Sequence, residues 1–362
     1  MNHIGNNIKL TFFGESHGEF LGIVIDQLPS GIKIDTDLID FNLKKRRPKN
    51  NNISTSRIEK DEYKIVSGFY NGYTTGGALT FLVPNENTNS KSYKNIETIP
   101  RPSHADYPAS IKYNNYNIKS GGGFFSGRLT VLWTIIGSIA QQILENKNII
   151  VSSHIYSIKD IFDDSFNLNK INENVCKTLN KDIFPVLNKN IKTKMIDLIE
   201  KTENDSLGGI VESSIINLPI GLGEPLFLSI ESYLSQLLFS VPAIKGIEFG
   251  KGFEITKILG SKANDEYIIK NEKITTLSNN NGGILGGLTT GRPVVLKCAI
   301  KPTPSITKKQ KSINLKTKEN TTLTIIGRHD PQIVSRIIHV INSVLNFAIL
   351  DLLLFNNKDR LI

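Results

Sequence analysis

The stretch IVSRIIHVINSVLNFAILDLLLF, residues 333–355, is the most apolar segment of this chain. It is long enough to cross a membrane as a helix. Polar and charged residues nevertheless recur along it: Arg336, His339, Asn342, Asn346 and Asp351. Because such residues are costly against lipid, we predict a buried helix of a cytoplasmic protein with no membrane association.

Shorter segments with strand-like or helix-like patterns of apolar residues precede this helix in the sequence. Runs rich in β-branched residues and bounded by turn residues predict strands at 22–28, 63–67, 78–83, 210–218 and 294–300. Helical patterns occupy 38–45, 129–144 and 172–201. Because strands and helices do not alternate regularly, we predict an α+β fold and not a doubly wound sheet, with residues 1–362 forming one domain.

The composition is that of an ordinary globular chain with an excess of positive charge. The 362 residues include 43 Lys and Arg against 34 Asp and Glu, a formal net charge of +9. This excess favours an anionic partner, and it leaves open a polyanionic metabolite, a nucleic acid or a membrane surface. Cys176 and Cys298 match neither a zinc pattern nor a disulfide framework, as expected in a reducing compartment, and residues 1–10 show no signal peptide.

Three short segments place a histidine among turn-forming or charged neighbours. They are GESHG (14–18), RPSHAD (101–106) and GRHDP (327–331). Segments so far apart in the chain meet only through folding, so we predict that they build one composite active site. His17 and His104 are the strongest candidates among the histidines, because each lies in a loop-like segment with Glu15 or Asp106 two residues away, which can tune its proton affinity. In the third segment, Arg328 and Asp330 are stronger candidates than His329.

Arginine is scarce in this lysine-rich chain, so its positions are informative. Those of interest border a motif or a predicted helix end: Arg46, Arg47, Arg101, Arg128 and Arg328. Bidentate binding of carboxylate or phosphate is a task suited to arginine. We therefore predict a pocket for a small substrate with several negative groups. Arg46 and Arg47, at the end of helix 38–45, are expected to be free to reach a ligand, and the polar loop 49–57 is a candidate lid.

Two further kinds of segment suggest phosphate binding. In KPTPS (301–305) two prolines fix the loop, and its lysine and hydroxyl groups suit phosphate. The glycine runs at 121–123 and 282–287 fit neither the dinucleotide nor the P-loop spacing, so they are weak signals.

In this order, these segments resemble the chorismate synthase family. The matching stretches cover nearly the whole chain: 11–18, 46–48, 67–76, 101–107, 121–123 with Arg128, 221–225, 246–253, 282–287, 301–306 and 327–331. GESHG together with RPSHAD and GRHDP is a specific combination. The resemblance implies the single-domain β-α-β layered sandwich of that family.

The resemblance also implies a reaction. It is the trans-1,4 elimination of phosphate from 5-enolpyruvylshikimate-3-phosphate to give chorismate. Reduced flavin mononucleotide (FMN) is required without net redox change, and NADPH is needed only if the enzyme reduces its own flavin. A homotetramer is expected, with no nucleic acid and no membrane as partner.

Site residues follow from the same resemblance. His17 would assist phosphate departure as a general acid, His104 would protonate or stabilise the reduced flavin, and Asp330 would assist hydrogen transfer. The substrate anions would be bound by Arg46, Arg47, Arg101 and Arg128. Flavin contacts would come from Ser126, Ala243, Gly286, Lys301, Pro302, Thr303, Pro304, Ser305 and Arg328. No metal ligand is implied.

The chain departs from the family pattern at 121–128, where GGGFFSGR replaces the usual Gly-Gly-Gly-Arg-Ser-Ser-Ala-Arg. We predict that Phe124 and Phe125 replace polar flavin contacts with apolar packing, so that flavin binding weakens while catalysis is retained. Pro242 and Asn52 are further departures. Two alternatives stay open: a basic nucleic-acid-binding protein, and a family member that keeps the fold without turnover.

Overall fold

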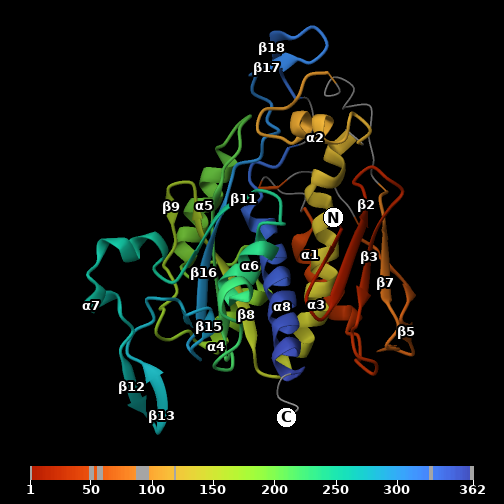
Figure 1. The fold of residues 1–362 in the computed structure, drawn as a ribbon. Coiled ribbons are helices and arrows are strands. Elements are labelled where there is room, and N and C mark those ends of the chain that lie inside the picture. Colours follow the sequence, from red (N-terminus) through yellow and green to blue (C-terminus); the bar gives the residue numbers. More distant parts are fainter. Residues whose placement is uncertain are drawn as a thin grey trace.

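The computed structural model describes residues 2–48, 53–54, 60–86, 98–117, 120–325 and 329–358. Two antiparallel five-stranded sheets enclose a layer of helices (Figure 1). The first sheet comprises, in spatial order, β1 (His3–Ile4), β2 (Lys9–Gly14), β3 (Phe20–Asp26), β7 (Leu79–Pro84) and β4 (Lys64–Ser67). The second comprises β11 (Ile244–Phe249), β16 (Val294–Ile300), β10 (Gly209–Ile216), β8 (Ile150–Ile158) and β9 (Ile161–Phe162). The predicted α+β class and its β-α-β layering are confirmed.

Four helices fill the layer between the sheets: α1 (Thr36–Arg46), α3 (Thr130–Glu145), α6 (Ile230–Leu238) and α8 (Val334–Lys358). α3 and α8 pack closely because Gly137 has no side chain. A Cβ atom at this position would lie 2.3 Å from the Cβ atom of Ser343 on α8. Trp133 of α3 joins the layers, since its ring contacts Phe12 of the first sheet and Phe347 of α8.

α8 is the buried helix that its composition predicts. Its window Val334–Leu354 is apolar and long enough to span a membrane, yet 83% of that window is buried inside the protein. Asp351 shows how a charge is accommodated there. Its carboxylate accepts hydrogen bonds from the backbone N–H groups of Asn6, Asn7 and Ile8, each at 2.7 Å, and from the hydroxyl of Tyr233. This buried carboxylate therefore anchors the start of the chain to its last helix.

Most of the predicted elements are present within a few residues, and two regions differ. The helical pattern at 172–201 forms two helices, α4 (Glu173–Lys181) and α5 (Lys189–Glu200), because Pro185 interrupts it. Residues 250–282 contain a short helix α7 (Gly260–Ala263) and a hairpin of β12 (Tyr267–Lys270) and β13 (Lys273–Thr276), which extend away from the body (Figure 1). The candidate lid at 49–57 lies, except for residues 53–54, outside the described residues.

The remaining elements are short. They are α2 (Asp106–Lys112) and the strand pairs β5 (Phe69–Tyr70) with β6 (Tyr73–Thr74), β14 (Ile284–Leu285) with β15 (Leu288–Thr289), and β17 (Gln310–Asn314) with β18 (Glu319–Leu323). The 3₁₀ turns among the described residues are η2 (Ser120–Phe125), η3 (Gly127–Leu129), η4 (Leu226–Leu228) and η5 (Gly252–Lys257).

Candidate active site

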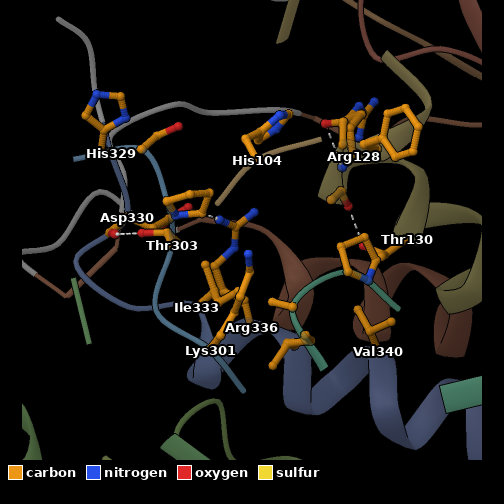
Figure 2. Close-up of a pocket in the computed structure, with 18 of the residues that line it drawn as sticks. His104, Arg128, Thr130, Lys301, Thr303, His329, Asp330, Ile333, Arg336 and Val340 are labelled. Atoms are coloured by element: carbon orange, nitrogen blue, oxygen red, sulfur yellow. Dashed lines mark hydrogen bonds and ion pairs between the residues drawn. The ribbon is translucent and has the colours of Figure 1, made fainter. Parts of the chain in front are cut away.

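A cavity of about 520 Å³ lies beside the first turns of α8 (Figure 2). Its volume is in the range of small-molecule sites. Five cationic side chains line it: Arg46, Arg101, Arg128, Lys301 and Arg336. His104, His329 and Asp330 also line it, so the second and third histidine segments of the sequence share one cavity.

On one side the cavity borders a cluster of arginines, which we call the arginine cluster: Arg46, Arg47 and Arg128 around the carboxylate of Asp61. Arg46 Nη1 lies 3.0 Å and Arg47 Nε 3.6 Å from Asp61 Oδ2, while Arg128 Nη1 binds Oδ1. The side chain of Asp61 is fully buried. α1 ends at Arg46 before Pro48, and α3 begins just after Arg128, so two helix ends deliver the three arginines to one carboxylate.

The arginine cluster corrects one expectation. Arg46 and Arg47 are not free at a helix end: Arg46 donates to Asp61, to Thr130 Oγ1 at 3.1 Å and to two backbone carbonyls of η3 at 3.2 Å. Arg46 still lines the cavity, but Arg47 does not. The reason is electrostatic, because a buried guanidinium needs a partner for its charge and its N–H groups.

His104 is oriented by Arg101 and Asp106 of its own segment. Nδ1 of His104 lies 2.7 Å from Asp106 Oδ1 and 3.1 Å from Arg101 Nη2. Arg101 Nη2 itself donates to Asp106 Oδ1 at 2.7 Å, so we assign the Nδ1 proton to the bond with Asp106. Nε2 is then the nitrogen of His104 that can exchange a proton with a ligand.

The carboxylate of Asp106 is well suited to this orienting role. Its burial opposes ionisation, but hydrogen bonds from Arg101 and His104, and their charges, outweigh that effect and hold the pKa of Asp106 well below its usual range. Gly122 leaves room for the imidazole: with φ at +98°, it would place a Cβ atom 3.3 Å from His104 Cε1 and Nε2. A fixed acid and a glycine thus set the position of the His104 ring.

His17 is not among the cavity-lining residues. Its segment is nevertheless tied to the arginine cluster through Asn85, whose amide donates to the carbonyls of Glu15 and Gly18 at 2.9 Å and whose Oδ1 accepts from Arg128 Nε at 3.2 Å. Ser16 N also donates to the carbonyl of Gly123 at 3.5 Å. All three histidine segments therefore converge on the same part of the molecule, with His17 outside the cavity lining.

The opposite side of the cavity carries Asp330 and Arg336. Arg336 Nη1 donates to Asp330 Oδ2 at 2.7 Å, and Arg336 Nε donates to the carbonyl of Arg46 at 3.2 Å. Thr303 Oγ1 donates to the carbonyl of Asp330 at 3.1 Å (Figure 2). Arg336 therefore connects the last helix to α1 across the cavity.

Only some of the residues predicted to contact flavin line the cavity. Those that line the cavity are Ser126, Ala243, Lys301, Thr303, Pro304 and Ser305. Pro302 lies within the same loop but is not a lining residue, and Gly286 is exposed in the tight turn between β14 and β15. Arg328 and Asn52 lie outside the described residues. Of the two phenylalanines, Phe125 lines the cavity and Phe124 does not.

The residues present suit a flavin phosphate and ring. Lys301, Thr303 and Ser305 offer a cation and hydroxyl groups on one loop, which suits a phosphate. Apolar and aromatic surface for a planar ring comes from Phe125 and from Pro242, which also lines the cavity. Ala243 beside it is held at φ +78°, an uncommon conformation for alanine, and its carbonyl accepts from Lys301 N at 3.0 Å.

Fold and cavity together define an α+β enzyme with a small-molecule site. A solved structure described as a crystal structure of chorismate synthase matches this fold with a TM-score of 0.73 at 24% identity, covering 98% of this chain and 93% of that one. The family model for chorismate synthase matches residues 8–354. This chain belongs to the chorismate synthase family.

Similar proteins span the full length. A chorismate synthase of Korarchaeum cryptofilum is 40% identical over 349 residues, which is 96% of each chain. One of Pyrococcus abyssi is 41% identical over 358 residues, covering 97% of each chain, and one of Dehalococcoides mccartyi is 39% identical over 356 residues. Family membership supports chorismate synthase activity on a small-molecule substrate.

Two site residues were missed by reasoning from the sequence. Arg336 was counted only as a charge within an apolar helix, although a cation in such a segment is itself a signal of a buried partner. Asp61 gave no signal, because it stands among charged neighbours, Lys60 and Glu62, in a segment without a recognisable motif.

Proposed function

We propose that this chain eliminates phosphate from C3 and hydrogen from C6 of 5-enolpyruvylshikimate-3-phosphate to form chorismate. The observation that carries the proposal is the charge of the cavity. Within the described residues, it has five cationic side chains, and three carboxylates pair with members of this group: those of Asp61, Asp106 and Asp330. The surplus of positive charge suits a substrate with two carboxylates and a phosphate.

The chain's own residues bind and orient this substrate and handle protons. Arg101 and Arg128 face the cavity with guanidinium groups already fixed by Asp106 and Asp61, so little ordering is needed when an anion binds. His104 presents Nε2 for proton exchange, as the tautomer fixed by Asp106 requires. We propose His17 as general acid to the departing phosphate and Asp330, held by Arg336, as the group that assists hydrogen removal.

The proposal includes reduced FMN as cofactor. The chemistry it supplies when bound is a transient donation of electron density, with no net redox change. Lys301, Thr303 and Ser305 would hold its phosphate, and Phe125 would contact its ring in place of polar groups.

An anaerobic assay of the purified chain tests the activity. With chemically reduced FMN and the shikimate ester, we expect chorismate and inorganic phosphate in equal amounts, and none with oxidised FMN. Addition of NADPH without another reductant then shows whether the chain reduces its own flavin. Absence of product with saturating reduced FMN would contradict the proposed function and favour a member that has lost turnover.

We also propose a cytoplasmic homotetramer. Support comes from large apolar side chains exposed on η4, on η5 and on the β12–β13 hairpin: Phe227, Phe253 and Ile269, which are 89%, 79% and 80% exposed. Apolar surface of this kind is typical of an interface. Light scattering of the purified chain measures its mass, and a monomer at assay concentration would contradict the proposed assembly.

A further inference from the structure

The arginine cluster is built around one carboxylate, that of Asp61, which does not itself reach the cavity. Asp61 pairs with Arg46, Arg47 and Arg128, and two of these arginines line the cavity while Asp61 does not. The carboxylate is fully buried, so substrate in the cavity can sense it only through the arginines.

The two oxygens of Asp61 are divided between the arginines. Oδ1 binds Arg128 Nη1, while Oδ2 binds Arg46 Nη1 at 3.0 Å and lies 3.6 Å from Arg47 Nε. Together with the bonds of Arg46 Nε to Thr130 and of Arg128 Nε to Asn85, these contacts fix the guanidinium planes of Arg46 and Arg128. Asp61 itself has a φ of +50°, a left-handed conformation that aspartate tolerates better than most residues. Its backbone, just before β4, is therefore shaped to aim this side chain.

Further hydrogen bonds of Arg46 and Arg128 hold both side chains in place beside the cavity. Arg128 Nε donates to Asn85 Oδ1 at 3.2 Å and Arg128 Nη2 to the carbonyl of Pro84 at 3.1 Å. Arg46 donates to two carbonyls of η3, the turn from which Arg128 projects. Asp61 is the shared acceptor of this network, so moving its carboxylate would turn both cavity-lining arginines.

Charge explains why one carboxylate serves three cations. Three guanidinium groups this close repel one another, and a single carboxylate reduces the repulsion without neutralising the group. Among the described residues, the arginine cluster has three cations and one carboxylate, a surplus of positive charge that attracts an anion. Full neutralisation would orient the arginines equally well but would remove that attraction.

We propose that Asp61 is a positioning residue, an internal counter-ion that holds Arg46 and Arg128 in the orientation that binds the substrate's anionic groups. This inference rests on the proposed function for its kinetic consequence only. Asp61 also competes with incoming anions for the same N–H groups. It therefore weakens anion binding in general while favouring the one orientation that leads to reaction.

The test is Asp61→Asn in the full-length chain, with two readouts. Binding of inorganic phosphate, measured by calorimetry, is expected to tighten, because the arginine cluster gains one net positive charge and loses its internal competitor. Turnover of the shikimate ester is expected to fall about 100-fold in kcat, with KM unchanged or lower, because a small misplacement of a binding group has this cost. Simple structural damage would instead weaken both binding and turnover.

Two further variants complete the experiment. Asp61→Glu keeps the charge, so it should fold and bind phosphate like the unaltered chain, yet its longer side chain should lower kcat. The Asp61→Glu variant therefore tests the proposal even if Asp61→Asn does not fold. Asp182→Asn is the matched control, because Asp182 pairs with Lys192 at 2.8 Å outside the cavity lining, and it should change neither readout.

Particular results would overturn the proposal. Weaker phosphate binding in Asp61→Asn, or an unchanged kcat in Asp61→Glu, would show that the carboxylate does not orient the arginines. If the unaltered chain makes no chorismate, the proposed function fails. The phosphate titration still reports whether Asp61 restrains the arginine cluster, so the two failures can be told apart.

Discussion

Two buried charge clusters lie in different halves of this molecule, and they differ in balance. The arginine cluster holds three cations around one carboxylate beside a cavity. The second, which we call the histidine cluster, consists of His154, Asp163, Glu212 and Lys297 in the second sheet. His154 bonds Asp163 through Nδ1 at 3.0 Å and Glu212 through Nε2 at 2.8 Å. Since both partners are carboxylates, we assign a proton to each ring nitrogen, and the charges of these four residues balance. Lys297 also lies 4.0 Å from the more exposed Glu248.

The contacts of the histidine cluster are structural. Glu212 also accepts from the backbone N–H of Phe166 at 2.6 Å, and Asp163 accepts from the N–H of Leu187 at 2.6 Å. The cluster therefore fastens the segment around α4 to the sheet. None of its members is among the cavity-lining residues. In this molecule, the cluster whose charges balance holds segments of the fold together, whereas the cluster with surplus positive charge beside a cavity is prepared for an anion.

The largest expected effect is on turnover at the cavity. His104→Ala removes the proposed proton-exchange group, so kcat should fall roughly 10²- to 10⁴-fold in the steady-state assay. His3→Ala serves as control, because His3 is exposed on β1 at the surface. Equal kcat values for His104→Ala and the unaltered chain would contradict the assignment of the cavity as the reactive site.

A variant of the histidine cluster should show the opposite pattern. Glu212→Gln leaves Asp163 as the single carboxylate bonded to His154 and removes the charge that faces Lys297, so it should lower the free energy of unfolding by about 1.5–3 kcal/mol. Urea denaturation measures this change, while kcat below the unfolding transition should stay the same. The control is Glu254→Gln, which removes only an exposed pair with Lys257. Loss of kcat in a folded Glu212→Gln chain would contradict the structural assignment of this cluster.

Arg336→Met tests the cation that joins the two sides of the cavity. Hydrogen bonds to charged groups contribute about 1.5–3 kcal/mol, so kcat/KM should fall roughly 10- to 100-fold. Arg336→Lys should recover part of this loss, because it keeps the charge without the planar donor pattern. The control is Arg292→Met, since Arg292 bonds Asn169 and does not line the cavity. Equal losses in both arginine variants would indicate a general effect of removing arginine.

The smallest expected effect is a pH dependence of stability. Burial lowers the pKa of His154, but its bonds to Asp163 and Glu212 outweigh burial, and the pKa is raised above the ordinary value. The stability contributed by this protonation is complete below about pH 6.5 and is lost as the pH rises through the folded-state pKa. The difference in unfolding free energy between the unaltered chain and His154→Gln should therefore shrink with rising pH. A difference independent of pH would contradict the assigned double protonation.

Reasoning from the sequence predicted the elements whose signal is local. The strand at 294–300 and the long helix near the C-terminus are found where predicted, because β-branched runs and apolar periodicity depend on neighbours in the chain. The hairpin of β12 and β13 was not predicted. The segments on either side of the hairpin are joined by Asp265, which accepts from the hydroxyl of Ser278 and the N–H groups of Asn280 and Asn281. Such polar contacts give the sequence no regular pattern of apolar residues from which a hairpin could be predicted.

The chemical groups of the site, such as His104 and Asp330, can be identified from motif spacing without coordinates. Their partners follow only from the folded chain. Asp61 and Arg128 are 67 residues apart, and Arg336 and Arg46 are 290 apart. Pairing over such separations is fixed by helix packing and by the need of each buried charge for a counter-ion, and neither leaves a pattern between neighbours in the chain.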